Sequence, residues 1–195
     1  DAQVVLIDLG PNLGALNRAV LGGCDYFITP LSPDLFSIKG TQNLGNKFVV
    51  WHDEWENNLR KWKRNDGGIP SDDLPNGAPV FLGYVMQQHN IRNTRSGMTK
   101  GWEIFGSKVD EAVTNNIVKK LLPLQQVAQK EIYLLGKIPN LHSLIPYSLN
   151  AHKPVYKCTS QDGLTGSHLT KARESKELYQ GIVQEITSVL DKENN

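Results

Sequence analysis

Cysteine and charge of one sign are both scarce in this sequence, and each scarcity excludes a class of protein. The 195 residues include two cysteines, Cys24 and Cys158, too few for a disulfide scaffold or a four-ligand zinc site. Lys and Arg total 21 against 20 Asp and Glu, so a uniformly basic nucleic-acid binder is not indicated, although a local basic patch stays open. No apolar run approaches the roughly 20 residues of a transmembrane helix. The composition fits one globular domain in a reducing, cytoplasmic setting.

Short apolar runs alternate along the chain with helical patterns, and this alternation predicts the fold class. Strands are predicted at 4–8, 26–29, 80–87 and 133–138, and helices at 13–21, 35–63, 99–122 and 167–190. A Gly- and Pro-rich loop is expected at 65–79, and 146–166 is expected to be irregular. Because the strands are apolar on both faces, we expect a single α/β domain over residues 1–195 with a doubly wound, mostly parallel sheet. Functional residues are then expected at the carboxyl ends of the strands.

Asp8 is the first residue that suggests a chemistry. It directly follows four aliphatic residues, Val4 to Ile7, which is the pattern of a Walker B strand. A carboxylate at the end of such a strand can hold Mg²⁺ beside the phosphates of a nucleotide. The pattern is short, and an acid after a strand can also simply cap the next helix.

Four segments, in order along the chain, resemble the ParA/Soj partitioning ATPases, which are relatives of MinD. Residues 4–14, V-V-L-I-D-L-G-P-N-L-G, are similar to the family's hhhhD-x-P-P-S-L-G segment. Residues 25–40 follow its pattern of a strand, a proline and a loop that enters a helix, and 83–93 resemble the strand that leads into its D-x-R-T-N turn. The K-I-P-N string at 137–140 and the K-P-V string at 153–155 are similar to its I-P-R-N and x-P-I elements. The resemblance implies a P-loop NTPase-like fold.

The resemblance also implies roles for individual residues. Asp8 would be the catalytic carboxylate associated with Mg²⁺, and Gly10, Pro11 and Asn12 would form a switch-like turn near the γ-phosphate of ATP. Adenine contacts would come from Gln87 and Pro139, and nonspecific DNA binding from Lys157, with Lys119 and Lys120 as further members of the patch. The chain departs from the family pattern at Gly10, where proline is common, and at Asn90, where aspartate is common.

The family's phosphate-binding loop, a deviant Walker A of the form K-G-G-x-x-K-T, does not occur in the sequence. Without its lysine and backbone N–H groups, Mg²⁺–ATP loses most of its binding and transition-state stabilisation. We therefore expect the chain alone to be inactive and to be the C-terminal part of a longer ATPase. The alternative is a P-loop-less module that binds DNA or a protein partner without catalysis.

The resemblance implies partners as well. A ParA-like protein would form an ATP-dependent homodimer, bind DNA nonspecifically on the nucleoid, and respond to a ParB-like stimulating partner. Loss of the P-loop unit would leave apolar sheet surface uncovered, which favours dimerisation or poor solubility. A MinD-like role on membranes is disfavoured, because the residues after 190 lack a basic and aromatic membrane face.

Aromatic residues recur at helical spacing in the segment 35–63: Phe48, Trp51, Trp55 and Trp62. This stripe is expected to pack in the core, and a partner surface is the alternative. The basic run at 60–64 is expected to be a solvent-exposed helix end, and contact with nucleic acid is the alternative. Each cysteine is expected to be a small buried residue.

Overall fold

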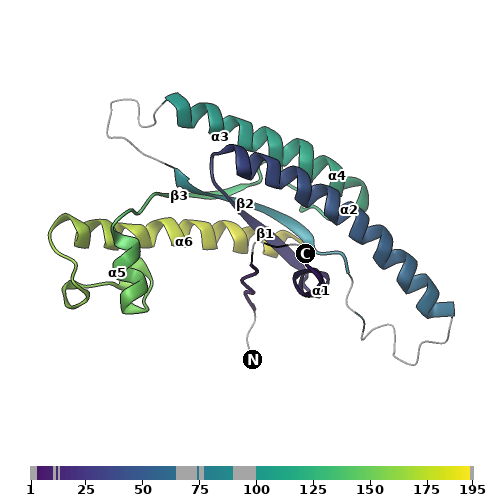
Figure 1. Cartoon of the computed structure of the whole chain (residues 1–195), viewed down its shortest axis with the longest axis horizontal. Helices are drawn as coiled ribbons and strands as arrows, with labels where there is room; N and C mark the ends of the chain where they lie inside the picture. Colours follow the sequence, from purple (N-terminus) through teal and green to yellow (C-terminus); the bar gives the residue numbers. More distant parts are fainter. Residues whose placement is uncertain are drawn as a thin grey trace.

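The computed structural model describes residues 4–10, 12, 14–64, 74, 77–89 and 100–193. Its centre is a sheet of three parallel strands, β1 (Tyr26–Leu31), β2 (Val80–His89) and β3 (Leu134–Pro139), in the order β1-β2-β3. Helices lie on both faces of this sheet (Figure 1). The expected α/β class with a parallel sheet is confirmed.

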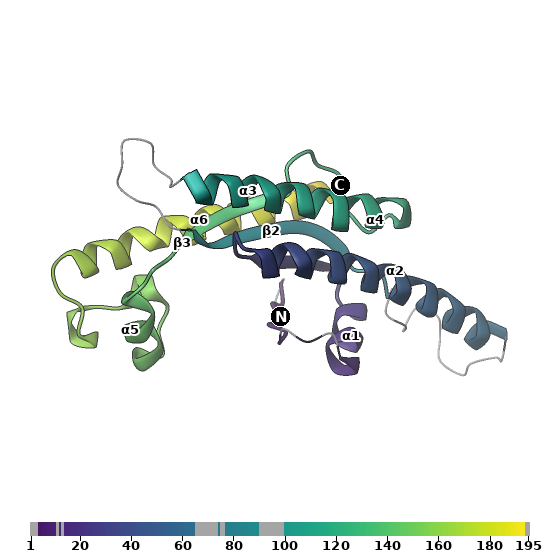
Figure 2. The same cartoon turned by 45° about the horizontal axis from the view of Figure 1, so that its top comes forward.

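The two faces of the sheet carry different helices. On one face lie α2 (Leu35–Arg64), α3 (Lys100–Val113) and α4 (Lys119–Leu121), and a π-helical turn, Thr114–Val118, joins the last two (Figures 1 and 2). On the other face lies α6 (Ser167–Glu193). The shorter α1 (Ala15–Gly22) precedes β1, and α5 (Leu144–Ala151) follows β3.

Strand β2 is buried on both faces, and its side chains reach both helical layers, with a register shift against β1 at Leu82. Phe81 and Met86 belong to the main core, which also contains Phe48 of α2 and Val109 of α3. Leu82 instead joins a second cluster with residues of α6. This arrangement explains why 80–87 reads as an unbroken apolar run, which is typical of a central parallel strand.

Helix α6 covers the second face through apolar residues at helical spacing. Ile182 packs with Val85 and Leu135 of the sheet, and Val189 packs with Leu82. Gly136 of β3 makes room for this contact, because a Cβ atom there would lie 2.5 Å from Cγ1 of Ile182. The expected C-terminal helix is therefore present. No helix within the described parts of the chain is long and apolar enough to cross a membrane.

A satellite cluster lies beside this sheet and joins α5 to the start of α6. It contains Leu144, Val155, Cys158, Leu164 and Ala172, all of them buried. Cys158 thus has the small, buried role expected of it, whereas Cys24 is half-buried. Two 3-10 turns, Val155–Lys157 and Ser160–Asp162, connect the two helices.

Two of the sequence-based expectations are wrong. Residues 4–8 do not form a strand, and Val4 and Leu6 are 61% and 87% exposed. A strand needs a neighbour for its backbone N–H and C=O groups, and no described strand pairs with this segment. Residues 144–151, expected in part to be irregular, form α5. Most of the expected loop at 65–79 lies outside the described residues, and the other predicted helices and strands are confirmed to within a few residues.

Candidate functional site

The carboxyl ends of β2 and β3 meet at one edge of the sheet and bring two predicted site residues together. In the parallel register Gln87 lies opposite Ile138, and His89 lies opposite Pro139. Gln87 and Pro139 are therefore diagonal neighbours at the carboxyl ends of β2 and β3, and both are half-buried. Because side chains alternate along a strand, Gln87 projects to the same face of the sheet as Ile138, and Pro139 projects to the other face.

The turn from β1 into α2 reaches the same edge, because β1 is parallel to β2. Side chains fix its shape: the backbone N–H of Ser37 donates to Oδ1 of Asp34 at 2.7 Å, and that of Ser32 donates to Oγ of Ser37 at 2.9 Å. The Asp34 carboxylate thus satisfies a backbone donor in the first turn of α2 and is engaged in capping. Polar residues thus lie at the carboxyl ends of the three parallel strands, with Asp34 after β1, Gln87 near the end of β2 and Asn140 after β3.

Asp8, Gly10 and Asn12 lie before α1 and outside the sheet. Asp8 is exposed. The Nδ2 group of Asn17 donates to the carbonyl oxygens of Gly10 and Asn12 at 2.9 and 2.7 Å, which closes the turn from the side of α1. Pro11 lies outside the described residues. Asn17 therefore holds the backbone of Gly10 and Asn12, and Asp8 lies outside the three described strands.

A nucleotide with Mg²⁺ would need more than these residues. Within the described parts of the chain, no group of three or more His, Cys, Asp or Glu side chains could hold a metal ion. Gln87 and Pro139 lie at the carboxyl ends of β2 and β3, and among the described residues no metal-binding group of that kind accompanies them. No catalytic step is derived from them.

The three lysines assigned to DNA binding do not form one patch. Lys119 and Lys120 belong to α4 on one face of the sheet, and their Nζ atoms donate to Oδ1 of Asn115 (2.7 Å) and of Asn46. Lys157 is exposed in the 3-10 turn beside α5 and α6, at the opposite end of the molecule (Figure 1). Lys157 therefore lies apart from Lys119 and Lys120 in the fold.

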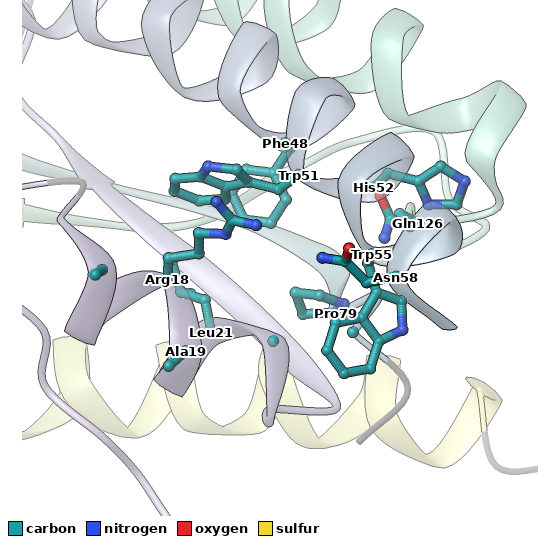
Figure 3. A pocket seen from close by; sticks show the side chains of 13 residues that line it. Arg18, Ala19, Leu21, Phe48, Trp51, His52, Trp55, Asn58, Pro79 and Gln126 are labelled. Carbon is teal, nitrogen blue, oxygen red and sulfur yellow. The ribbon is translucent and has the colours of Figure 1, made fainter. Parts of the chain in front are cut away.

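A cavity of about 500 Å³ lies between α1, α2 and the segment 77–79 (Figure 3). Its lining is mostly apolar and aromatic, and includes Leu21, Phe48, Trp51, Trp55, Pro79 and Gln126. Phe48 is 3% exposed and stacks on Phe27 of β1 with ring centroids 4.5 Å apart, so this part of the lining belongs to the core. The volume lies within the range of small-molecule sites.

Contacts between α1 and α2 hold the cavity open. The guanidinium of Arg18 pairs with the Glu54 carboxylate at 2.5 Å and lies 5.9 Å from the ring of Trp51. Figure 3 shows Arg18 reaching from α1 toward Trp51. The backbone N–H of Gly77 donates to the carbonyl oxygen of Gly22 at 3.0 Å. This hydrogen bond connects the segment 77–79, which forms one side of the cavity, to the end of α1.

Gly77 also positions Trp55. A Cβ atom on Gly77 would lie 2.3 Å from the Trp55 ring, so the indole rests directly against the glycine backbone. The φ of +66° at Gly77 is a conformation that favours glycine. The aromatic spacing of this helix predicts a stripe packed in the core, but Phe48 is the only one of its four aromatic residues that is buried. Helical spacing in a sequence shows which residues share one face of a helix, but it does not show whether that face packs in the core or lines a cavity.

A solved structure is distantly similar to this chain. It is the crystal structure of a Corynebacterium diphtheriae protein, a Northeast Structural Genomics Consortium target, at 26% sequence identity and a TM-score of 0.43. The match covers 76% of this chain and 46% of that one, so the chain spans just under half the length of that protein. No protein-family model and no curated protein matches the chain. The α/β class stated above rests on this protein's own strands.

Proposed function

We propose that the chain is the C-terminal part of a ParA-like ATPase, in which the edge formed by Gln87 and Pro139 receives the adenine base. The longer protein would hydrolyse ATP with Mg²⁺, dimerise, bind DNA nonspecifically and move a plasmid, chromosome or other cargo. The phosphate-binding loop would come from residues that precede this chain. In the same proposal, the longer protein is located in the cytoplasm and associates with the nucleoid.

The observation that carries the proposal is the register of β2 and β3. Gln87 and Pro139 lie 52 residues apart in the sequence, and the resemblance assigns both to the base. Parallel pairing brings the ends of their strands together, with Gln87 opposite the residue that precedes Pro139, where ligands of open α/β sheets bind. This supports the proposal that both residues lie near one ligand at the carboxyl ends of β2 and β3.

A second candidate is a module without a phosphate-binding loop that binds DNA or a protein and performs no catalysis. The absence of a K-G-G-x-x-K-T string from the 195 residues favours it. The two candidates differ in the coding sequence upstream of residue 1. A frame that continues and encodes K-G-G-x-x-K-T supports the ATPase, and a start codon directly before residue 1 supports the module.

Kinetics of the protein expressed with its upstream coding sequence test the role of the edge. Gln87→Ala should raise KM for ATP about tenfold with kcat little changed, because the lost contact binds substrate and transition state alike. Gln42→Ala is the matched control, since Gln42 is an exposed residue of α2 whose side chain accepts a hydrogen bond from the neighbouring Lys39. An unchanged KM in Gln87→Ala would remove this residue from the base site.

A further inference from the structure

We propose that the basic end of α2, residues 60–64, binds the phosphate backbone of duplex DNA. This basic end reads R-K-W-K-R and places four cations within five residues of a chain whose formal net charge is +1. It belongs to a different element from Lys157, and its test needs neither ATP nor any residue upstream of the chain. Three features carry the proposal: the protrusion of α2, the accessibility of the four cations, and their arrangement around the helix.

The basic end lies on a part of α2 that buries no residue. The helix has 30 residues, which is about 45 Å at 1.5 Å per residue, yet its buried residues all lie in its first half: Thr41, Gly45 and Phe48. Figures 1 and 2 show the second half extending past the sheet and past the other helices. Because helices in proteins are stabilised mostly by packing, the core does not account for these last turns, whereas a surface for a partner does.

The cations of the basic end are accessible to a polyanion. The four, all of them exposed, are Arg60, Lys61, Lys63 and Arg64. No described carboxylate forms an ion pair with any of them. Arg60 instead donates from Nη2 to Oδ1 of Asn57 at 2.9 Å and from Nε to the backbone carbonyl oxygen of Glu56 at 3.3 Å. Phosphates can therefore approach without competing against a described carboxylate.

The acidic residues of α2 precede the basic end. They are Asp53, Glu54 and Glu56, and Glu54 is already paired with Arg18 at 2.5 Å. Because a helix rises 1.5 Å per residue, Glu56 lies about 6 Å from Arg60 and about 12 Å from Arg64 along the axis. The charge of α2 is thus divided along its length, and a polyanion is attracted to the end of the helix.

The arrangement of the four cations fits a DNA groove. At 3.6 residues per turn, their side chains spread over an arc of about 160° around the helix axis. An α-helix with its side chains is about 10–12 Å wide and the major groove of DNA is about 12 Å wide, so the end of α2 can enter it. Cations on both sides of the helix then face the phosphates of both strands, where arginine can form two parallel hydrogen bonds.

An anionic membrane fits the basic end less well. A helix that lies on a membrane needs an exposed apolar face beside its basic face. Within the described chain, no large hydrophobic side chain of α2 after Val50 is exposed, and Leu59 and Trp62 are half-buried. The exposed part of the basic end therefore offers charge and hydrogen bonds, which phosphates of DNA use, and little apolar surface.

Fluorescence anisotropy of a short labelled DNA duplex, titrated with the 195-residue chain at several salt concentrations, tests the proposal. The triple variant Lys61→Ala, Lys63→Ala and Arg64→Ala should weaken binding about tenfold or more. It should also reduce the slope of log affinity against log salt by about 2–3, because each phosphate contact contributes about 0.9.

A second triple variant is the matched control. Lys39→Ala, Lys47→Ala and Lys108→Ala remove the same charge from exposed positions of α2 and α3 outside the basic end. This variant should keep the affinity within about threefold and the salt slope within about one phosphate contact. Both variants place alanine at exposed helical positions, so both should fold, and circular dichroism checks this.

Four results would overturn the proposal. They are no binding of DNA by the wild-type chain, unchanged affinity in the first triple variant, equal loss in both triple variants, and binding to phosphatidylserine vesicles in place of DNA. Lys157→Ala in the same assay separates this proposal from the proposed function. Loss of binding in Lys157→Ala with none in the first triple variant would keep the Lys157 surface and overturn the role of α2, and the reverse result would support the role of α2 alone.

Discussion

Gly45 of α2 lies against the backbone of Asn116 so closely that a Cβ atom on Gly45 would sit 1.8 Å from the Asn116 carbonyl oxygen. The contact falls at the π-helical turn between α3 and α4. Beside it, Nδ2 of Asn116 donates to Oγ1 of the buried Thr41 at 3.0 Å. The helical layer over one face of the sheet therefore depends on a backbone contact that tolerates no side chain.

Gly45→Ala should lower the free energy of unfolding by about 1–3 kcal/mol or more, because the backbone of one helix must move. Gly40→Ala is the matched control on the same helix. A Cβ there meets nothing within 4 Å, so higher helix propensity should raise stability by about 0.5–1 kcal/mol. Urea unfolding followed by circular dichroism measures both. Similar effects from the two substitutions would contradict the close contact.

Tyr84 predicts a pH dependence of stability. Its hydroxyl, in a residue that is 1% exposed, donates to the Asp110 carboxylate and links β2 to α3. Burial, then this hydrogen bond, raises the pKa of Tyr84 above its ordinary value of 10.0. The folded chain thus keeps a proton that the unfolded chain releases, so this contribution is complete below about pH 10 and declines as pH rises further.

Tyr84→Phe isolates that contribution. The variant should lose about 1 kcal/mol of stability at pH 8. The difference between wild type and variant should stay constant from pH 8 to about pH 10 and shrink between pH 10 and pH 11, as measured by urea unfolding at each pH. A difference that stays constant, or grows, between pH 10 and pH 11 would show that the Tyr84 proton is not held more tightly in the folded state.

The separation of the basic residues predicts which lysine matters for DNA. Under the proposed function, Lys157→Ala should weaken nonspecific DNA binding and reduce its salt dependence by about one phosphate contact. Lys119→Ala should leave binding by the Lys157 surface unchanged, because Lys119 is on α4 in the opposite helical layer. Fluorescence anisotropy at several salt concentrations measures both. Loss of binding from Lys119→Ala alone would place the DNA surface on α4.

Elements defined by local pattern could be predicted from the sequence, and those defined by a neighbour could not. The apolar run at 80–87 became β2 because strands lie on both sides of it and helices on both faces. The equally apolar run at 4–7 has no strand beside it among the described residues and stays exposed. Hydrophobicity predicts that a segment favours burial, but pairing decides whether it is a strand.

The candidate sites divide in the same way. Gln87 and Pro139 could be placed at one edge, because parallel strands align their carboxyl ends. The cavity could not be predicted. Gln126 follows a left-handed residue, Gln125, with φ of 57°, and its position opposite α2 depends on a backbone path that no periodicity encodes.

The measurement that tests the proposed function most directly is Mg²⁺-dependent ATP turnover by the protein expressed with the coding sequence upstream of residue 1. The account predicts turnover that DNA or a partner protein stimulates, and none from the 195-residue chain alone. It further predicts that Asp8→Ala lowers turnover by about a hundredfold or more without loss of folding. Absence of turnover in the longer protein, or normal turnover in Asp8→Ala, would contradict the account.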